Sequence, residues 1–463
     1  MGILTPRRNQ MLLTAWAGFF VNYLDRTKTA ALLPLIVAAL AMTKEQTGWV
    51  LFAFFIGYAA VQPIAGFVTD LVGARKTLAV SVAAFSVFTW TMAMVNSWEE
   101  LLIRNAIFGV AQGFELTAGC RLVATWFPVR TRGRAFAFHQ TAYTLGPVIV
   151  PFIAVPLAQA FGSWRWSFMI IAFFGLPVLA AIDRFVIDRP ERDPKISQEE
   201  LDYIFGAEEM ANKQGTVLNP TKAHSQDELP PGERLVSYRE IFLNRSVFLM
   251  FVAGFFNLIF LWGMATWLPT YGVRQLKLPL LWAGSLSSIL YLGSFFGVVA
   301  GGILSDKFFG TMRTPVWLLG GLLTAGAIVW AISFQPGVAL WEAYLCFFVV
   351  GFFTSWTPIG QLYAPYFAEL LTPGAVGRAV GVVNLGSQVG SAVAQPLTAM
   401  LIIQTATGQQ FWPAFVMFAV FGVLTSACVA GTIEPKVGRP YLAYLLSGKK
   451  AKTAVGTSAG QTL

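Results

Sequence analysis

The sequence predicts an all-α integral membrane protein with twelve transmembrane helices in two pseudo-symmetric six-helix halves. Three observations predict this fold: an apolar composition, twelve apolar segments of membrane-spanning length, and motifs that recur in both halves. Of the 463 residues, 56% are hydrophobic and 12% are charged, and the mean hydropathy is +0.62. Soluble domains carry about 25% charged residues. The composition therefore excludes a soluble enzyme or a nucleic-acid-binding protein.

Each predicted span has about the 20 mostly apolar residues that a transmembrane helix needs. Prolines inside several spans are compatible with this, because neighbouring groups in a membrane bundle satisfy the freed backbone. The predicted spans are residues 11–38, 47–70, 77–97, 99–127, 134–160, 165–187, 243–270, 281–305, 315–334, 338–367, 377–403 and 411–432.

The spans divide the chain into four expected parts. These are an N-terminal half at 1–187, a cytoplasmic linker loop at 188–240, a C-terminal half at 241–435 and a cytoplasmic tail at 436–463. The linker holds 19 of the 55 charged residues, and its residues 197–210 predict a short amphipathic helix. The stretch around residues 214–231 is expected to be flexible. We expect the linker to be a tether between the halves; regulation or partner docking is the alternative.

The distribution of Lys and Arg predicts that both termini are cytoplasmic, since cytoplasmic loops are enriched in these residues. We expect a multi-pass protein of the plasma (inner) membrane. The opposite side would receive only Lys44, Arg165, Arg274 and Lys277. The cytoplasmic side would receive, besides the linker, Arg7, Arg8, Arg75, Lys76, Arg130, Arg132, Arg134, Lys307, Arg313, Arg378, Lys449, Lys450 and Lys452.

The cysteines and histidines predict neither a disulfide framework nor a metal site. Cys120, Cys346 and Cys428 lie in apolar runs, and His139 and His224 are far apart. No cofactor is expected. The apolar run after Arg8 is too long for a cleavable signal peptide and is predicted to be the first span.

Two motifs occur once in each half. Residues 66–76 (GFVTDLVGARK) correspond to 302–313 (GILSDKFFGTMR), and each follows the second span of its half. Residues 126–135 (WFPVRTRGRA) correspond to 366–379 (YFAELLTPGAVGRA). Two related six-span halves are the architecture of many secondary transporters, whose substrate site lies near mid-membrane at the repeat interface.

The motif at 66–76 resembles the loop motif of the major facilitator superfamily, and the resemblance extends over essentially the whole chain. Within that superfamily, residues 22–26 (NYLDR), 121–128 (RLVATWFP) and 266–271 (TWLPTY) resemble the anion:cation symporter family. The resemblance implies a monomeric secondary transporter, not an enzyme, that moves a small organic anion across the lipid bilayer. Sugar acids, aromatic acids and dicarboxylates are typical substrates, often carried with protons. Sodium as the coupled ion is the alternative.

Ionisable residues inside spans are functional candidates because they are costly there. Asp25 and Lys28 are three residues apart on one helix face and can pair. By resemblance, Arg26 binds the substrate carboxylate, which suits its fork geometry, and Asp25 is a protonation site. Lys28 departs from the family pattern. It either neutralises Asp25, making it a poor proton carrier, or adds a second substrate-binding charge.

The fourth span also departs from the family pattern, because Gln112 stands where an acid is usual. Glu115, three residues further on, can replace that proton site; a structural pairing with Arg121 or Lys28 is the alternative. Arg104 is either a second substrate-binding cation or an interfacial arginine that reaches toward headgroups.

Further polar candidates lie in the fifth span and in the second half. His139 either relays protons or packs as a hydrogen-bonded residue. Tyr143, one turn away, is a substrate-binding candidate. In the second half, neutral side chains are expected to bind the uncharged part of the substrate. These are Asn257, Gln361, Asn384 and Gln388.

Charges at the cytoplasmic ends of the spans predict a gate. Asp70 can pair with Arg130, Arg132 or Arg134 in one conformation and separate from them in another. Arg75 and Asp306 belong to the same repeated motif. Charge that only sets the topology is the alternative. Arg121, Asp183 and Glu369 are expected to be structural or gating.

Two other functions stay open from the sequence alone. An organophosphate or anion exchanger also uses paired cations, but an acid beside the cation suits ion coupling better. A transporter-like membrane sensor would be expected to carry a long signalling domain, and residues 188–240 are too short and polar for one.

Overall fold

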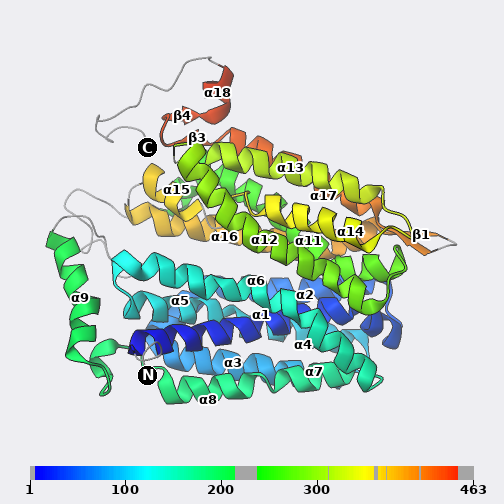
Figure 1. Ribbon diagram of the computed structural model, residues 1–463, viewed down its shortest axis with the longest axis horizontal. Helices are drawn as coiled ribbons and strands as arrows, with labels where there is room; N and C mark the ends of the chain where they lie inside the picture. The colour runs from blue at the N-terminus through cyan, green and yellow to red at the C-terminus, as the bar shows by residue number, and fades with distance from the viewer. Residues whose placement is uncertain are drawn as a thin grey trace. The chain divides into compact units, whose positions relative to one another are not determined.

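The computed structural model describes residues 6–213, 237–310, 312–358, 363–371, 373–405 and 408–446. These residues are mainly α-helical (Figure 1). The side chain of Arg130, a gating candidate, and the whole of Gln361, a substrate-binding candidate, lie outside the described part.

The described residues 6–213, which hold the first six predicted spans and the beginning of the linker, contain nine α-helices. Each span coincides with one helix or with two consecutive helices. The helices are α1 (Arg7–Ala39), α2 (Lys44–Val72), α3 (Ala74–Met92), α4 (Trp98–Gly113), α5 (Glu115–Trp126), α6 (Val129–Ala160), α7 (Trp164–Ala172), α8 (Gly175–Phe185) and α9 (Gln198–Lys213), with a 3-10 turn η1 (Pro190–Arg192) before α9.

The last six predicted spans coincide with helices in the same way. The helices are α10 (Tyr238–Leu243), α11 (Arg245–Arg274), α12 (Leu280–Phe308), α13 (Thr314–Ile332), α14 (Leu340–Thr354), α15 (Tyr363–Leu370), α16 (Pro373–Leu401), α17 (Trp412–Ala430) and α18 (Tyr441–Leu446). Two short antiparallel hairpins complete this part: β1 (Ile403–Thr405) with β2 (Gly408–Gln410), and β3 (Ile433–Glu434) with β4 (Arg439–Pro440).

Six helical segments in the described part are long and apolar enough to cross a membrane, and the bent α2 brings the number to seven. The remaining predicted spans are broken into shorter helices or carry more polar residues. The fourth span, for example, is interrupted at Phe114, so that Glu115 begins a new helix.

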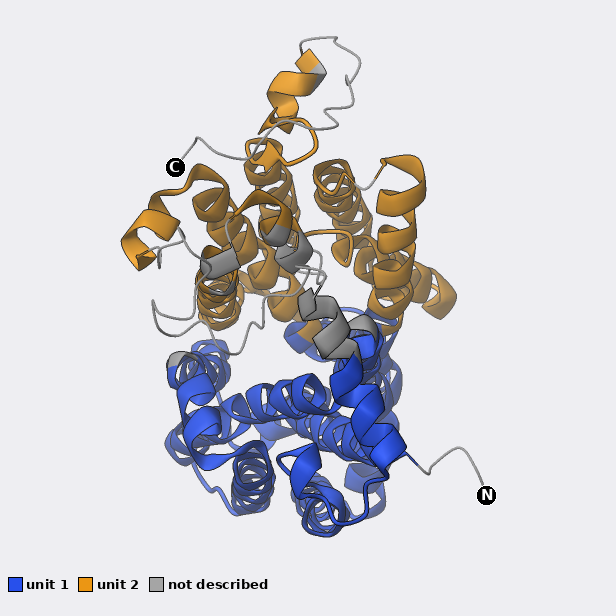
Figure 2. Cartoon of the chain, turned by 90° about the vertical axis from the view of Figure 1, so that its left-hand side faces the viewer, with its two compact units in different colours: residues 1–218, 266–291 blue, residues 219–265, 292–463 orange. Residues whose placement is uncertain are grey.

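The described chain forms two compact units (Figure 2). Unit 1 comprises residues 1–218 and 266–291, and unit 2 comprises 219–265 and 292–463. Two of the three boundaries therefore fall inside α11 and α12. The four-part division expected from the sequence, with its linker at 188–240, stays a prediction.

Glycines let equivalent helices approach closely within each unit. In unit 1, a Cβ on Gly109 of α4 would lie 2.1 Å from the Phe54 carbonyl oxygen of α2. In unit 2, a Cβ on Gly297 of α12 would lie 2.1 Å from the Phe352 carbonyl oxygen of α14. Small residues at such crossings are a general means of packing membrane helices, and here they recur in the two halves.

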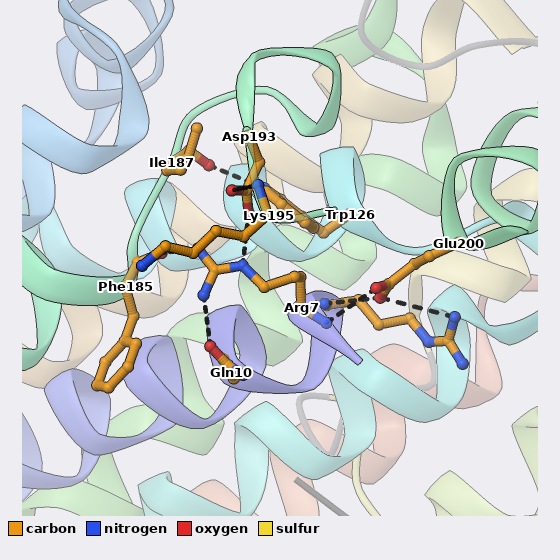
Figure 3. A network of polar contacts seen from close by, with 9 residues as sticks. Arg7, Gln10, Trp126, Phe185, Ile187, Asp193, Lys195 and Glu200 are labelled. Atoms are coloured by element: carbon orange, nitrogen blue, oxygen red, sulfur yellow. Dashed lines mark hydrogen bonds and ion pairs between the residues drawn. The ribbon is translucent and has the colours of Figure 1, made fainter. Parts of the chain in front are cut away.

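The beginning of the predicted linker belongs to unit 1 and contacts the start of α1 (Figure 3). Arg7 Nε donates to Asp193 Oδ2 at 2.5 Å. The Glu200 carboxylate of α9 accepts the backbone N–H groups of Arg7 and Arg8, each at 3.0 Å, at the start of α1. A helix is predicted at 197–210, and α9 occupies nearly the same residues, which confirms that prediction. The flexible stretch expected around 214–231 lies outside the described residues.

Candidate functional site

Arg26 is held in the middle of α1 by side chains from three helices of unit 1. It is 9% exposed. Its Nε donates to Gln112 Oε1 of α4 at 3.1 Å, and one terminal nitrogen donates to the Tyr23 hydroxyl at 3.2 Å. The guanidinium carbon lies 4.5 Å from the ring centre of Tyr23, 4.4 Å from that of Tyr58 and 5.1 Å from that of Phe54. These cation–π contacts stabilise a charge that is largely buried.

The orientation of the Gln112 carboxamide is fixed by the backbone of α1. Gln112 Nε2 donates to the Asn22 carbonyl oxygen at 2.9 Å, and Asn22 Nδ2 donates to the Gln112 carbonyl oxygen at 3.5 Å. Because its nitrogen faces Asn22, the amide presents its oxygen to Arg26. The residue that departs from the family pattern is therefore a positioning residue for the buried guanidinium.

A row of tyrosines extends from Arg26. The Tyr23 and Tyr143 rings meet edge-to-face with centroids 4.9 Å apart, and Tyr143 meets Tyr291 at 6.0 Å. Tyr291 belongs to the part of α12 that lies in unit 1. The structure thus places the candidate Tyr143 beside the group around Arg26. Phenol groups combine an apolar face with a hydrogen-bonding tip, which suits a polyhydroxylated or aromatic acid.

Asp25 and Lys28 form an ion pair in which both side chains are 0% exposed. Lys28 Nζ lies 3.2 Å from Asp25 Oδ1. The ammonium donates to the Asp25 carbonyl oxygen at 2.8 Å and to Thr89 Oγ1 at 3.1 Å. Of the two alternatives for Lys28, this structure favours neutralisation of Asp25.

Glu115 is 0% exposed at the first position of α5. Gly18 of α1 lies beside it: a Cβ there would be in van der Waals contact, 3.4 Å from Glu115 Oε1. Within the described part of the chain, neither carboxyl oxygen has a hydrogen-bond partner. Glu115 also lies within electrostatic reach of Arg26.

The two basic residues considered as structural partners of Glu115 pair elsewhere. Lys28 pairs with Asp25, and Arg121 pairs with Asp70. The structural alternative for Glu115 is therefore wrong for this conformation. A buried carboxyl group without donors is costly when ionised, and this makes Glu115 the stronger proton-site candidate.

His139 and Arg104 are placed apart from the contacts of Arg26. His139 is 0% exposed on α6, and its ring stacks on Phe19 with centroids 4.8 Å apart. That contact favours packing, and the hydrogen bond expected in that alternative stays a prediction. Arg104 donates to the Thr91 carbonyl oxygen and lies 3.5 Å from Glu100, with its side chain 30% exposed. Those contacts favour the interfacial alternative.

The described candidates of unit 2 form neutral pairs. Asn257 of α11 is 1% exposed and donates to Thr357 Oγ1 at 2.6 Å. On α16, Gln388 Nε2 donates to Asn384 Oδ1 at 3.5 Å, as expected for residues four apart on a helix.

The cytoplasmic charges include one pair that the sequence did not name. Asp70 pairs with Arg121 of α5. Its expected pairing with Arg130, whose side chain lies outside the described part, or with Arg132 or Arg134, stays a prediction. Arg121 also donates to the Thr69 carbonyl oxygen at 2.8 Å, so it closes over the end of α2. The sequence placed Arg121 near this end of the bundle, but spacing alone could not show which arginine faces Asp70.

The other gating candidates have separate environments. Arg75 pairs with Asp183 at 2.8 Å. Arg134 and Asp306 have exposed side chains. In unit 2, Arg313 pairs with Glu369 at 2.8 Å. Asp183 and Glu369 thus have the structural contacts expected for them.

The arrangement of helices, repeated motifs and buried charges can be compared with known proteins. Residues 15–367 match the sequence profile described as "Major Facilitator Superfamily". The match covers well over half of the chain. The protein belongs to the Major Facilitator Superfamily.

Several relatives of this superfamily member cover nearly its full length. A "Hexuronate transporter" of Bacillus subtilis (strain 168) is 25% identical, covering 93% of this chain and 96% of its own. A "Probable galactarate/D-glucarate transporter GarP" of Escherichia coli (strain K12) is 25% identical, with 92% and 95% covered. The "Membrane sensor protein UhpC" of Salmonella typhimurium (strain LT2) is 26% identical, with 87% of each chain covered.

A solved structure of a bacterial homologue of the human lysosomal transporter Spinster has the same fold. Its TM-score is 0.69 at 17% sequence identity, with 92% of this chain and 94% of that chain covered. The superfamily fold and the multi-pass membrane character predicted from the sequence are thus confirmed. The members of the superfamily named here are transporters or a sensor rather than enzymes, as predicted.

Sequence reasoning missed several residues that build the site of this superfamily member. Thr89 supplies a ligand to Lys28 from α3, and Tyr58 supplies a ring to Arg26 from α2. Neither carries a signal in the sequence, because a threonine or tyrosine inside a span is common. Gln112 did carry a signal, since it replaces an expected acid.

Proposed function

We propose that this protein is a secondary active transporter that moves a small organic anion, a carboxylate such as a sugar acid, across the membrane. The observation that carries the proposal is the buried Arg26 guanidinium, fixed by Gln112 and Tyr23 and enclosed by aromatic rings. An arginine inside a membrane span is costly and functional by default. Its planar fork matches a carboxylate.

The names of the relatives support this substrate class. Hexuronate, galactarate and D-glucarate are polyhydroxylated acids, and the relatives named for them match over almost the whole chain. Tyrosines 23, 143 and 291 near Arg26 would contact the hydroxyl-bearing part of such an acid. In unit 2, Asn257, Asn384 and Gln388 are proposed to contribute neutral hydrogen-bonding groups.

The coupled ion is proposed to be a proton carried by Glu115. Its two carboxyl oxygens are buried and lack hydrogen-bond partners among the described residues. Asp25, the other acid of the group, is engaged by Lys28. Protonation of Glu115 would remove a negative charge near Arg26, so proton binding and anion binding would favour each other.

The orientation and gating follow the charge distribution. We propose an inner-membrane monomer with both termini cytoplasmic, because Lys and Arg concentrate at the predicted cytoplasmic loops. Asp70 and Arg121 are proposed to hold one conformation and to separate in the other. Arg75 and Asp183 lie in the same region and would act with them.

The test is binding and uptake with purified protein. D-glucuronate, D-galactonate and D-glucarate should raise the melting temperature, whereas uncharged D-glucose and cationic D-glucosamine should not. In proteoliposomes, an inward proton gradient should drive accumulation of the acid that stabilises the protein. Stabilisation by D-glucosamine alone would contradict the anion proposal.

A sensor is the second candidate, because a membrane sensor protein is among the relatives. A sensor would bind the acid without accumulating it. The proteoliposome experiment therefore separates the two functions, since thermal stabilisation without uptake is the result expected from a sensor.

A further inference from the structure

Lys28 brings a positive charge into the interior of unit 1, where oxygen atoms surround it. Its Nζ lies 2.8 Å from the Asp25 carbonyl oxygen, 3.1 Å from Thr89 Oγ1 and 3.2 Å from Asp25 Oδ1. The Lys28 side chain is fully buried. The ammonium therefore has a carboxylate, a carbonyl and a hydroxyl oxygen around it, contributed by α1 and α3.

Two phenyl rings flank the same ammonium. The ring centres of Phe108 on α4 and Phe168 on α7 each lie 4.6 Å from Nζ. Aromatic faces attract cations of low hydration. The groups that face the ammonium from the neighbouring helices are thus a hydroxyl from α3 and rings from α4 and α7.

Carboxylate, carbonyl and hydroxyl oxygens are the ligands that proteins offer to hard cations. An alkylammonium group at 2.8–3.2 Å satisfies the same oxygens. Lys28 enters this position from the turn that follows Asp25, so the cation is tied to the chain and cannot leave with the substrate.

We propose that the Lys28 ammonium is a tethered cation that fills a site which, without this side chain, binds a free monovalent cation such as Na⁺, K⁺ or methylammonium. The tether keeps such cations away from Asp25. The inference concerns cation binding alone and goes beyond the proposed function, so either can fail while the other stands.

The test is thermal unfolding of wild type and Lys28→Ala in detergent at one ionic strength. The salts are NaCl, KCl, methylammonium chloride and the chloride of N-methyl-D-glucamine, a cation too large for the site. Wild type should melt at one temperature in all four. Lys28→Ala should melt several degrees higher in at least one small cation, with a saturating concentration dependence.

Three matched variants locate the effect. Lys195→Ala removes a lysine whose side chain is exposed and should respond like wild type. Asp25→Asn/Lys28→Ala should lose the cation response, because the carboxylate is gone. Thr89→Val/Lys28→Ala should need a higher cation concentration for the same shift.

A Lys28→Ala variant that is too unstable to purify in N-methyl-D-glucamine is extracted directly into each salt. Recovery as a single gel-filtration peak in a small cation, and not in N-methyl-D-glucamine, supports the site. Equal loss in all four salts overturns it. A cation response of Lys28→Ala no larger than that of wild type, or one that survives Asp25→Asn, also overturns the proposal.

Discussion

Asp188 caps the third helix of its half through the backbone of Arg75. The Arg75 N–H donates to Asp188 Oδ1 at 2.7 Å, at the second residue of α3. The second half repeats the contact, because the Thr314 N–H at the start of α13 donates to Glu434 Oε2 at 3.1 Å. Each acid lies a few residues beyond the last long helix of its half, α8 or α17. The pseudo-symmetry of the sequence thus extends to its helix caps.

Replacing either capping acid should lower stability. The first N–H groups of a helix have no intrahelical partner, and an acid there also interacts well with the helix dipole. Loss of a cap costs about 0.5–2 kcal/mol. Glu434 is 1% exposed, so we expect Glu434→Ala to lie at the upper end and to exceed Asp188→Ala.

The measurement for the capping acids is the melting temperature of the purified variants. Glu99→Ala, an exposed acid in the first turn of α4, is the control for removing one negative charge. A Glu434→Ala protein that melts like Glu99→Ala would show that the cap contributes nothing.

Gly73 should not tolerate alanine. Its φ of +98° is strained for residues with a Cβ. An added Cβ would also lie 2.8 Å from Asp188 Oδ2. Gly73→Ala should therefore lower the melting temperature, and Gly66→Ala, with no heavy atom within 4 Å of the added Cβ, should change it little. Equal melting of the two variants would contradict this reading of the loop.

Much of the fold could be predicted from the sequence, because the length of an apolar run and the charges beside it determine where a membrane helix lies. The helices coincide with the twelve predicted spans for this reason. The capping by Asp188 and Glu434 could not be predicted, since it joins residues more than a hundred positions apart. The break at Phe114 was missed as well, because no proline marks it.

The Asp70–Arg121 pair should matter for transport more than for stability. The two side chains are 43% and 28% exposed, and exposed pairs contribute about 0–1 kcal/mol. Asp70→Asn should therefore melt close to wild type but slow substrate uptake severalfold. Asp183, the partner of Arg75, is more exposed than Asp70. Asp183→Asn should therefore slow uptake less than Asp70→Asn.

A charge exchange tests whether that pair acts as a unit. Asp70→Arg/Arg121→Asp should recover part of the uptake lost by either single change. A double variant no better than the worse single variant would remove the gating role.

Lys28 should be essential for stability as long as Asp25 is ionised. Removing one partner of a buried pair costs about 3–5 kcal/mol, because the other charge is left uncompensated. Lys28→Met should therefore unfold at a much lower temperature than wild type. Asp25→Asn/Lys28→Met removes both charges and should recover most of the loss. A double variant as unstable as Lys28→Met would show that packing, not charge, sets the cost.

The site was only partly predictable for a physical reason. The Asp25–Lys28 pair follows from spacing on one helix, and the structure contains it. The side chains around Arg26 come from α2 and α4, so the sequence near Arg26 does not predict them. Asp70 shows the same limit, because its partner Arg121 lies 51 positions away and spacing did not distinguish it from the arginines that follow α5.

Glu115→Gln should separate binding from coupling. The amide resembles a protonated carboxyl group, so anion binding should persist and lose its dependence on pH. In wild type, binding should tighten as pH falls, because protonation of Glu115 removes a negative charge near Arg26. Proton-driven accumulation should be lost in Glu115→Gln, whereas exchange of labelled for unlabelled acid should continue. Normal accumulation by this variant would move the coupling site elsewhere.

Gln112 offers the sharpest test of the substrate site, because its two ends face different partners. Its oxygen accepts from Arg26 Nε, and its nitrogen donates to the Asn22 carbonyl oxygen. In Gln112→Glu, an ionised carboxylate would neutralise Arg26 and would also face that carbonyl without a proton to donate. We expect acid affinity at neutral pH to fall by about tenfold or more, equivalent to about 1.4 kcal/mol.

Acidification should reverse the Gln112→Glu defect. Once protonated, the introduced carboxyl group would be neutral and could donate to the Asn22 carbonyl oxygen, as the native amide does, so affinity should recover as pH falls. Gln112→Leu removes both hydrogen bonds at every pH and should weaken binding without that recovery. The acid affinity of both variants is measured by thermal stabilisation in a graded series of D-glucuronate concentrations at two pH values. Parallel pH profiles for the two variants would show that Gln112 positions Arg26 by shape alone and that the charge at this position is immaterial.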